Sequence, residues 1–262
     1  MGIPEVPMSE SRLRAALTDI GAINPFFVLA PERCTAIHPV SDLWNRPDLL
    51  AAEVTDVRDR LADSAAVPAS GVEKRVAASL LYQGLATRVL CPVVGSLLCH
   101  GHGPDPTALY WSPSRTGPLS FALGSETALL SLGEGGLDEA AALVRVYALE
   151  GVLAPLGAAL RAHVTVAPRL LWGNVASALA GAVTAVAAAR PHRAGEARGL
   201  AERVLARAPL AGLGEFVPPQ ADGHPVFVRT TCCLYYRVPG GGTCGDCALS
   251  SSRAPTSGDA PR

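Results

Sequence analysis

The sequence predicts a mainly α-helical, α+β fold: a helical domain, a small β element and a carboxyl-terminal cysteine-rich cap. Two patterns predict the helices and the β element. Apolar residues recur at steps of three and four in long stretches rich in alanine, leucine and valine, which is the spacing of a helix face. Two short stretches, 109–111 and 119–123, flank a turn rich in Ser, Pro and Gly, which is typical of paired strands.

The helices follow one another along most of the chain. We expect them at residues 9–20, 47–62, 70–90, 137–162, 170–189 and 193–208. Ser70 and Glu73 have capping-box spacing at the start of the third helix. Pro92 should end or kink that helix, and Pro155 should bend the 137–162 helix, because proline lacks the N–H that a helix needs.

The 170–189 helix is long enough to span a bilayer, since it has twenty residues without a charge. Eight of those twenty residues are alanine, and Asn174 and Thr184 are polar. Such a helix is only weakly lipophilic, and helices that are apolar all round also occur in protein cores. We therefore expect a buried helix, and membrane contact that is at most peripheral.

Composition limits the function classes. With 22 basic and 23 acidic residues, the chain has a formal net charge of −1, so it lacks the positive surface typical of nucleic-acid-binding proteins. The amino-terminal sequence shows no basic stretch followed by an apolar run, so we expect no signal peptide and a cytoplasmic protein. Seven cysteines in such a chain are expected to be reduced thiols and metal ligands.

Four of the cysteines lie close together near the end of the sequence. Cys232 and Cys233 are adjacent, and ten residues with three successive glycines separate them from the C-x-x-C pair Cys244 and Cys247. The glycines allow the chain to reverse and bring the two pairs together. Four thiolates suit zinc or an iron–sulfur cluster. Adjacent cysteines strain a single-ion site, so the spacing favours a two-iron cluster, with zinc or a disulfide pair as alternatives.

Residues 227–247 strongly resemble the cluster segment of the FhuF family, the ferric-siderophore reductases. Adjacent cysteines, ten residues and a C-x-x-C pair mark that family, and all four cysteines are present here. The resemblance is most specific over residues 226–249 and extends loosely to segments 171–174 and 79–83. It implies a [2Fe-2S] cluster held by Cys232, Cys233, Cys244 and Cys247, and therefore an iron–sulfur cap on the helical domain.

The resemblance also implies an activity. It predicts an enzyme that reduces Fe(III)-siderophore, of the hydroxamate type usual for the family, by one electron to release Fe(II), with no catalytic residue beyond the cluster. The corresponding domains are a substrate-binding helical domain at 1–214, a cluster segment at 215–250 and a disordered tail at 251–262. No nucleotide or flavin motif is present, so we expect the electrons to come from a separate protein, a ferredoxin or a flavin reductase.

Further residues are candidates for contact with the substrate or the cluster. Trp172, Asn174, Tyr235 and Arg237 could bind substrate, although core packing, capping or an ordinary surface position explains each as well. Arg229 and Arg237 could stabilise a reduced cluster. Two other functions stay open: a non-catalytic iron–sulfur redox or iron sensor, and a siderophore-binding module with a structural metal.

Overall fold

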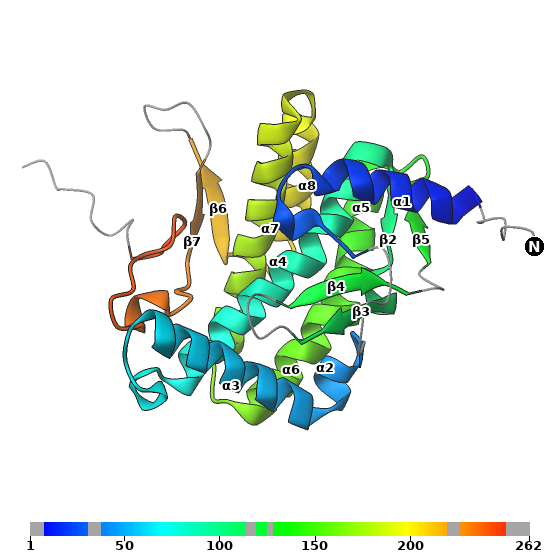
Figure 1. Ribbon diagram of the computed structural model, residues 1–262. Helices are drawn as coiled ribbons and strands as arrows, with labels where there is room; N and C mark the ends of the chain where they lie inside the picture. The colour runs from blue at the N-terminus through cyan, green and yellow to red at the C-terminus, as the bar shows by residue number, and fades with distance from the viewer. Residues whose placement is uncertain (1–7, 31–37, 114–118, 125–127, 219–225, 250–262) are drawn as a thin grey trace, which may run out of the picture.

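The computed structural model describes residues 8–30, 38–113, 119–124, 128–218 and 226–249. It confirms the mainly helical α+β architecture (Figure 1). The α-helices of the described residues are α1 (Met8–Gly21), α2 (Asp42–Asn45), α3 (Pro47–Ser64), α4 (Lys74–His100), α5 (Gly136–Leu143), α6 (Ala154–His163), α7 (Pro168–Ala189) and α8 (Ala194–Leu205).

The strands form three small antiparallel sheets. The predicted pair is β3 (Leu109–Ser112) and β4 (Ser120–Leu123), to which β1 (His38–Pro39) adds a third strand. The other two sheets are β2 (His102–Pro104) with β5 (Leu129–Ser131), and β6 (Gly214–Val217) with β7 (Val226–Arg229). We did not predict these two pairs; β2 and β5 are far apart in the sequence, so no hairpin pattern marks them.

The helix α4 lies at the centre of the fold. It packs most extensively against α7, and α1 and α3 also contact it (Figure 1). Leu171, Val175 and Leu179 of α7 are buried, so the uncharged helix does lie in the core. By length and composition alone, three helical stretches could cross a membrane: Lys74–His100, Gly136–His163 and Pro168–Ala189.

Of the two effects predicted for Pro92, an end to the helix is wrong, and a kink stays a prediction. Pro92 lies inside α4, which continues as a helix to His100. The residues on both sides of the proline, Leu90, Cys91 and Val93, are buried in the core. Their packing outweighs the cost of proline inside a helix, which is about 3 kcal/mol.

The predicted capping box is wrong. A 3-10 turn, η2 (Ala69–Gly71), contains Ser70, and α4 begins only at Lys74, after Glu73, whose side chain makes no capping hydrogen bond. The Glu73 carboxylate instead accepts hydrogen bonds from Arg75 and Arg237. A carboxylate prefers charged guanidinium donors to a backbone N–H. The structure thereby connects the start of α4 to the cysteine-rich segment.

The 137–162 helix is also more varied than predicted. Between α5 and α6 the chain winds as a π-helix, η4 (Val144–Leu153). Pro155 lies in the first turn of α6, where a missing N–H breaks fewer hydrogen bonds. The change in helical winding therefore precedes the proline that we expected to cause a bend.

The cysteine-rich segment lies against α4 and α7. The strands β6 and β7 contact α7, and the 3-10 turn η6 (Tyr235–Arg237) contacts α4. In Figure 1 this segment, coloured orange to red, lies beside the amino-terminal part of α4. The domain division at residue 214 stays a prediction, and the predicted disordered tail, 251–262, lies outside the described residues.

Candidate metal centre

The backbone after β7 folds into a compact loop that carries the four cysteines. Leu234, directly after the adjacent pair, has a left-handed conformation with φ of 72°, and η6 follows it. Few non-glycine residues adopt positive φ. The Leu234 N–H donates to the Cys232 sulfur at 3.3 Å, so the unusual backbone points a donor at a candidate ligand.

Glycine is needed at two positions of the return path. Gly240 has a φ of 72°, and a Cβ atom on Gly241 would lie 2.5 Å from the Tyr235 carbonyl oxygen. The run of glycines therefore reverses the chain, as the sequence predicts. The reversal brings Cys244 back to Cys233.

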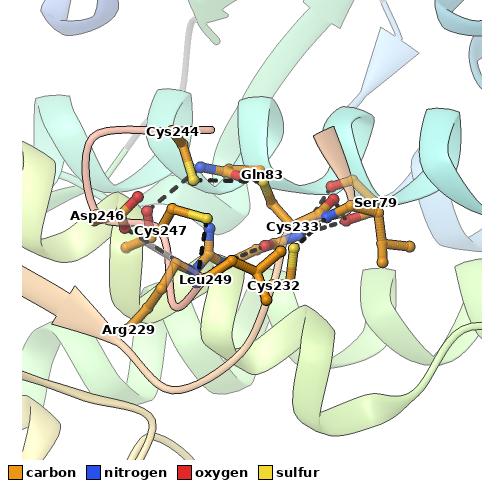
Figure 2. A network of polar contacts seen from close by, with 12 residues as sticks. Ser79, Gln83, Arg229, Cys232, Cys233, Cys244, Asp246, Cys247 and Leu249 are labelled. Atoms are coloured by element: carbon orange, nitrogen blue, oxygen red, sulfur yellow. Dashed lines mark hydrogen bonds and ion pairs between the residues drawn. The ribbon is translucent and has the colours of Figure 1, made fainter. Parts of the chain in front are cut away.

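The two cysteine pairs converge. The sulfur atoms of Cys233 and Cys244 are 3.6 Å apart, and the Leu249 N–H donates to the Cys247 sulfur at 3.4 Å (Figure 2). Two thiolates bound about 2.3 Å from one tetrahedral metal lie roughly 3.8 Å apart. The observed separation of Cys233 and Cys244 therefore matches two ligands of one metal ion.

Burial opposes ionisation of the thiols. The pKa of Cys244 is raised, first by burial and then by the charges of Cys233 and Asp246. Burial is also the largest cause that raises the pKa of Cys232, while the Leu234 N–H and Arg229 act in the opposite direction. Thiolates in this loop therefore need a cation, and bound iron or zinc would supply one.

A buried polar network attaches the loop to the two central helices. Arg229, at the end of β7, donates to the Asn174 side-chain oxygen on α7. The Asn174 amide donates to Ser79 on α4, and the Ser79 hydroxyl donates to the Cys233 carbonyl at 2.7 Å (Figure 2). Asn174 and Ser79 are completely buried, and Arg229 is only 1% exposed.

The α7 backbone also comes very close to the residues that precede Cys232. A Cβ atom on Gly173 would lie 1.7 Å from the Thr231 hydroxyl oxygen, so only glycine fits at this point of α7. Gly173 leaves space for Thr231, and the adjacent Asn174 accepts a hydrogen bond from Arg229. Together they hold the residues that precede Cys232 against α7. The family resemblance in segments 171–174 and 79–83 was the sequence signal for this contact, although it did not reveal what the segments do.

The surroundings of the loop suit a negatively charged metal centre. The buried Arg229 has two N–H groups, at Nε and Nη1, without a hydrogen-bond acceptor among the described residues. A cluster of negative charge, with sulfur acceptors, suits those donors.

The family comparison decides the nature of this loop. Residues 229–249 match the family model described as the FhuF 2Fe-2S C-terminal domain. The cysteine-rich segment is a FhuF 2Fe-2S domain. The match covers all four cysteines, and it identifies the cofactor as a [2Fe-2S] cluster. The match is confined to this carboxyl-terminal segment, and no curated protein matches the chain.

The structure places the predicted substrate residues in different surroundings. Tyr235 is 39% exposed beside the cysteines, and Arg237 pairs with Glu73 at the surface. Trp172 lines a cavity of about 110 Å³, well below the roughly 300 Å³ at which ligand pockets begin. A siderophore does not fit inside that cavity, and substrate contact by these three residues stays a prediction.

Asn174 has the buried position that core packing, one of the alternatives from the sequence, predicts. Its side chain is fully buried, and it hydrogen-bonds with Ser79 and Arg229. Both polar atoms of the Asn174 side chain already have protein partners, so this side chain holds the FhuF 2Fe-2S domain in place. A lone asparagine in an apolar helix does not show its partner in the sequence, so this role was not predicted.

Proposed function

We propose that the protein is a cytoplasmic ferric-siderophore reductase, which reduces a Fe(III)-siderophore of the hydroxamate type by one electron and so releases Fe(II). The observation that carries this proposal is the FhuF 2Fe-2S domain, with all four cysteines in one loop on the helical body. A [2Fe-2S] cluster supplies one electron at a time when bound. Fe(III) needs one electron to become Fe(II).

The substrate chemistry explains why one electron is sufficient. A siderophore binds Fe(III) through hard oxygen donors, and the same donors bind Fe(II) much more weakly. Reduction converts the ferric complex and one electron into Fe(II) and the free siderophore. No bond within the organic ligand has to break, so the chain needs no general acid or nucleophile for the release.

The position of the thiols supports electron transfer at the surface. Cys232 and Cys244 are partly exposed, whereas Cys233 and Cys247 are buried. Tyr235, Tyr236 and Leu249 are among the large exposed apolar side chains of the described residues. They lie in or directly after the loop and give it an apolar surface on which a ferric complex can rest, while the charge of Arg237 is already paired with Glu73.

The electrons come from a separate protein, a ferredoxin or a flavin reductase, in this proposal. The sequence has no recognisable nucleotide or flavin motif, so the chain has no evident means of accepting a hydride itself. The same partly exposed side of the loop would serve donor and substrate in turn. We expect membrane contact to be at most peripheral.

Anaerobic single-turnover reduction tests this function. The reduced protein, freed of excess reductant, is mixed with a ferric trihydroxamate and, separately, with a ferric tricatecholate, and a ferrous chelator traps the product. We expect close to one Fe(II) per reduced protein with the trihydroxamate. The Cys244→Ser variant should release none, while Cys99→Ser, which changes a cysteine on α4 outside the loop, should behave as the wild type.

The same experiment separates the two alternatives. A redox or iron sensor would take up an electron but would release no Fe(II) from either complex. A binding module with a structural metal would bind the siderophore without taking up an electron. Either result would contradict the reductase function.

A further inference from the structure

A positively charged side chain is buried next to the four cysteines. The Arg229 side chain is inaccessible to solvent at the end of β7. A buried charge is costly unless it is paired and hydrogen-bonded. The contacts of this guanidinium group therefore indicate the role of Arg229.

Protein groups supply only some of the hydrogen bonds that the Arg229 guanidinium can make. Asn174 accepts a hydrogen bond from Nη2, but it is neutral. The nearest carboxylate oxygen, on Asp246, lies 4.0 Å from Nε, which is too far for a hydrogen bond. Nε and Nη1 have no acceptor among the described residues. The Asp246 carboxylate is thus close enough for an ion pair, while two N–H donors remain without an acceptor among the described residues.

The fold holds Arg229 beside the cysteine loop. Its backbone N–H donates to the Asp246 carbonyl at 3.3 Å, so Arg229 is tied to the residue between Gly245 and Cys247. Its Nε lies 4.0 Å from the Asp246 carboxylate, so the buried guanidinium lies next to the C-x-x-C pair.

We propose that Arg229 sets the reduction potential of the cluster, as a fixed positive charge that Asn174 holds in place and that Asp246 opposes. A [2Fe-2S] unit with four thiolates has a charge of about −2, which becomes about −3 after it accepts one electron. A buried positive charge stabilises the more negative state more strongly, so it raises the potential. This inference rests on the cluster alone and is independent of the siderophore substrate.

A surface arginine would have a much smaller effect. Arg169 is exposed on α7, and it donates to the Gly212 carbonyl and to the Thr230 hydroxyl. Thr230 is the residue directly after Arg229. Its charge is screened by water and salt, whereas that of Arg229 is not. Removal of either charge therefore gives a matched comparison, with burial as the difference.

Anaerobic redox titration followed by visible absorption tests the proposal on the cluster-containing protein. In Arg229→Gln we expect the reduction equilibrium to shift at least tenfold towards the oxidised form, which corresponds to 59 mV for one electron. Arg229→Lys, which keeps the charge, should shift less. Asp246→Asn should shift the equilibrium in the opposite direction, and Arg169→Gln should stay within about twofold of the wild type.

Two results would overturn the proposal. One is a potential for Arg229→Gln equal to that of Arg169→Gln, which would leave Arg229 a purely structural role. The other result is needed if Arg229→Gln does not retain its cluster. In that case, an unchanged or lowered reduction potential in Asp246→Asn would contradict the proposal. Thermal unfolding of the cluster-free proteins gives a separate measure of the structural role. Failure to reduce siderophores would alter neither result.

Discussion

Asn174 on α7 accepts a hydrogen bond from Arg229, which lies 55 residues further along the chain. The Asn174 amide also donates to the Ser79 carbonyl on α4 at 3.0 Å. One buried side chain thus connects the two central helices with the strand that leads into the cysteines. Buried hydrogen bonds therefore connect the interior of the helical domain with the FhuF 2Fe-2S domain.

Asn174→Ala should destabilise the protein by about 2–4 kcal/mol, because it leaves a buried guanidinium donor and Ser79 without their partner. Denaturant unfolding of the cluster-free protein measures this loss. Asn45→Ala, at an exposed position in α2, is the control and should change stability by less than about 0.5 kcal/mol. Equal effects of the two variants would show that the network does not stabilise the fold.

Gly173→Ala should displace the residues before Cys232, because the added methyl group would overlap the Thr231 hydroxyl. Overpacking of this kind costs about 1–3 kcal/mol. Gly181→Ala on the same helix meets no atom within 4 Å and should stabilise the protein by up to about 1 kcal/mol. Unfolding free energies and the iron content of both variants are the measurements.

A second substitution tests whether the overlap is the cause. The Thr231 hydroxyl oxygen is buried and has no hydrogen-bond partner within the described part of the chain, so its removal costs little. Thr231→Ala should therefore restore part of the stability and iron content of Gly173→Ala. If it restores neither, the close approach of α7 is not what Gly173 provides.

The Glu73–Arg237 pair should make a pH-dependent contribution at the edge of the loop. The pKa of Glu73 is lowered by its hydrogen bonds to Arg237, first, and to Arg75. A lowered pKa means that the stabilisation is present above the ordinary value of about 4.3 and is lost as the pH falls through the folded value. Both groups are exposed, so we expect a small effect that salt weakens.

Thermal unfolding of the wild type and Glu73→Gln at pH 7 and at pH 3 measures this contribution. The wild type should be slightly more stable at pH 7, and the difference should shrink at pH 3 and in 1 M salt. A difference that neither acid nor salt reduces would mean that charge is not its origin.

Much of the fold followed from local patterns, and much of the site did not. The helices, the β3–β4 pair and the four cysteines could be predicted because spacing along the chain determines them. Pro92 inside α4 and the failed cap at Ser70 depend on packing and on the distant Arg237. The burial of Arg229 against Asn174 joins residues from separate elements, so no sequence window contains it.

Removal of the cluster should loosen the loop while the helical body stays folded. The cluster cross-links residues within the 232–247 loop, whereas the core lies mainly in the helices around α4. We expect the cluster-free protein to be cleaved by protease between residues 230 and 250 and to keep its helical circular dichroism. Loss of the helical signal together with the cluster would show that the whole fold depends on the metal.

A [2Fe-2S] cluster on these four cysteines should take up one electron. Iron and acid-labile sulfide analysis of anaerobically purified protein, with absorption and EPR spectra before and after reduction by dithionite, measures this directly. We expect about two irons and two sulfides per chain, and a spin-half signal only in the reduced protein. A colourless protein with one zinc per chain and no EPR signal would contradict this expectation.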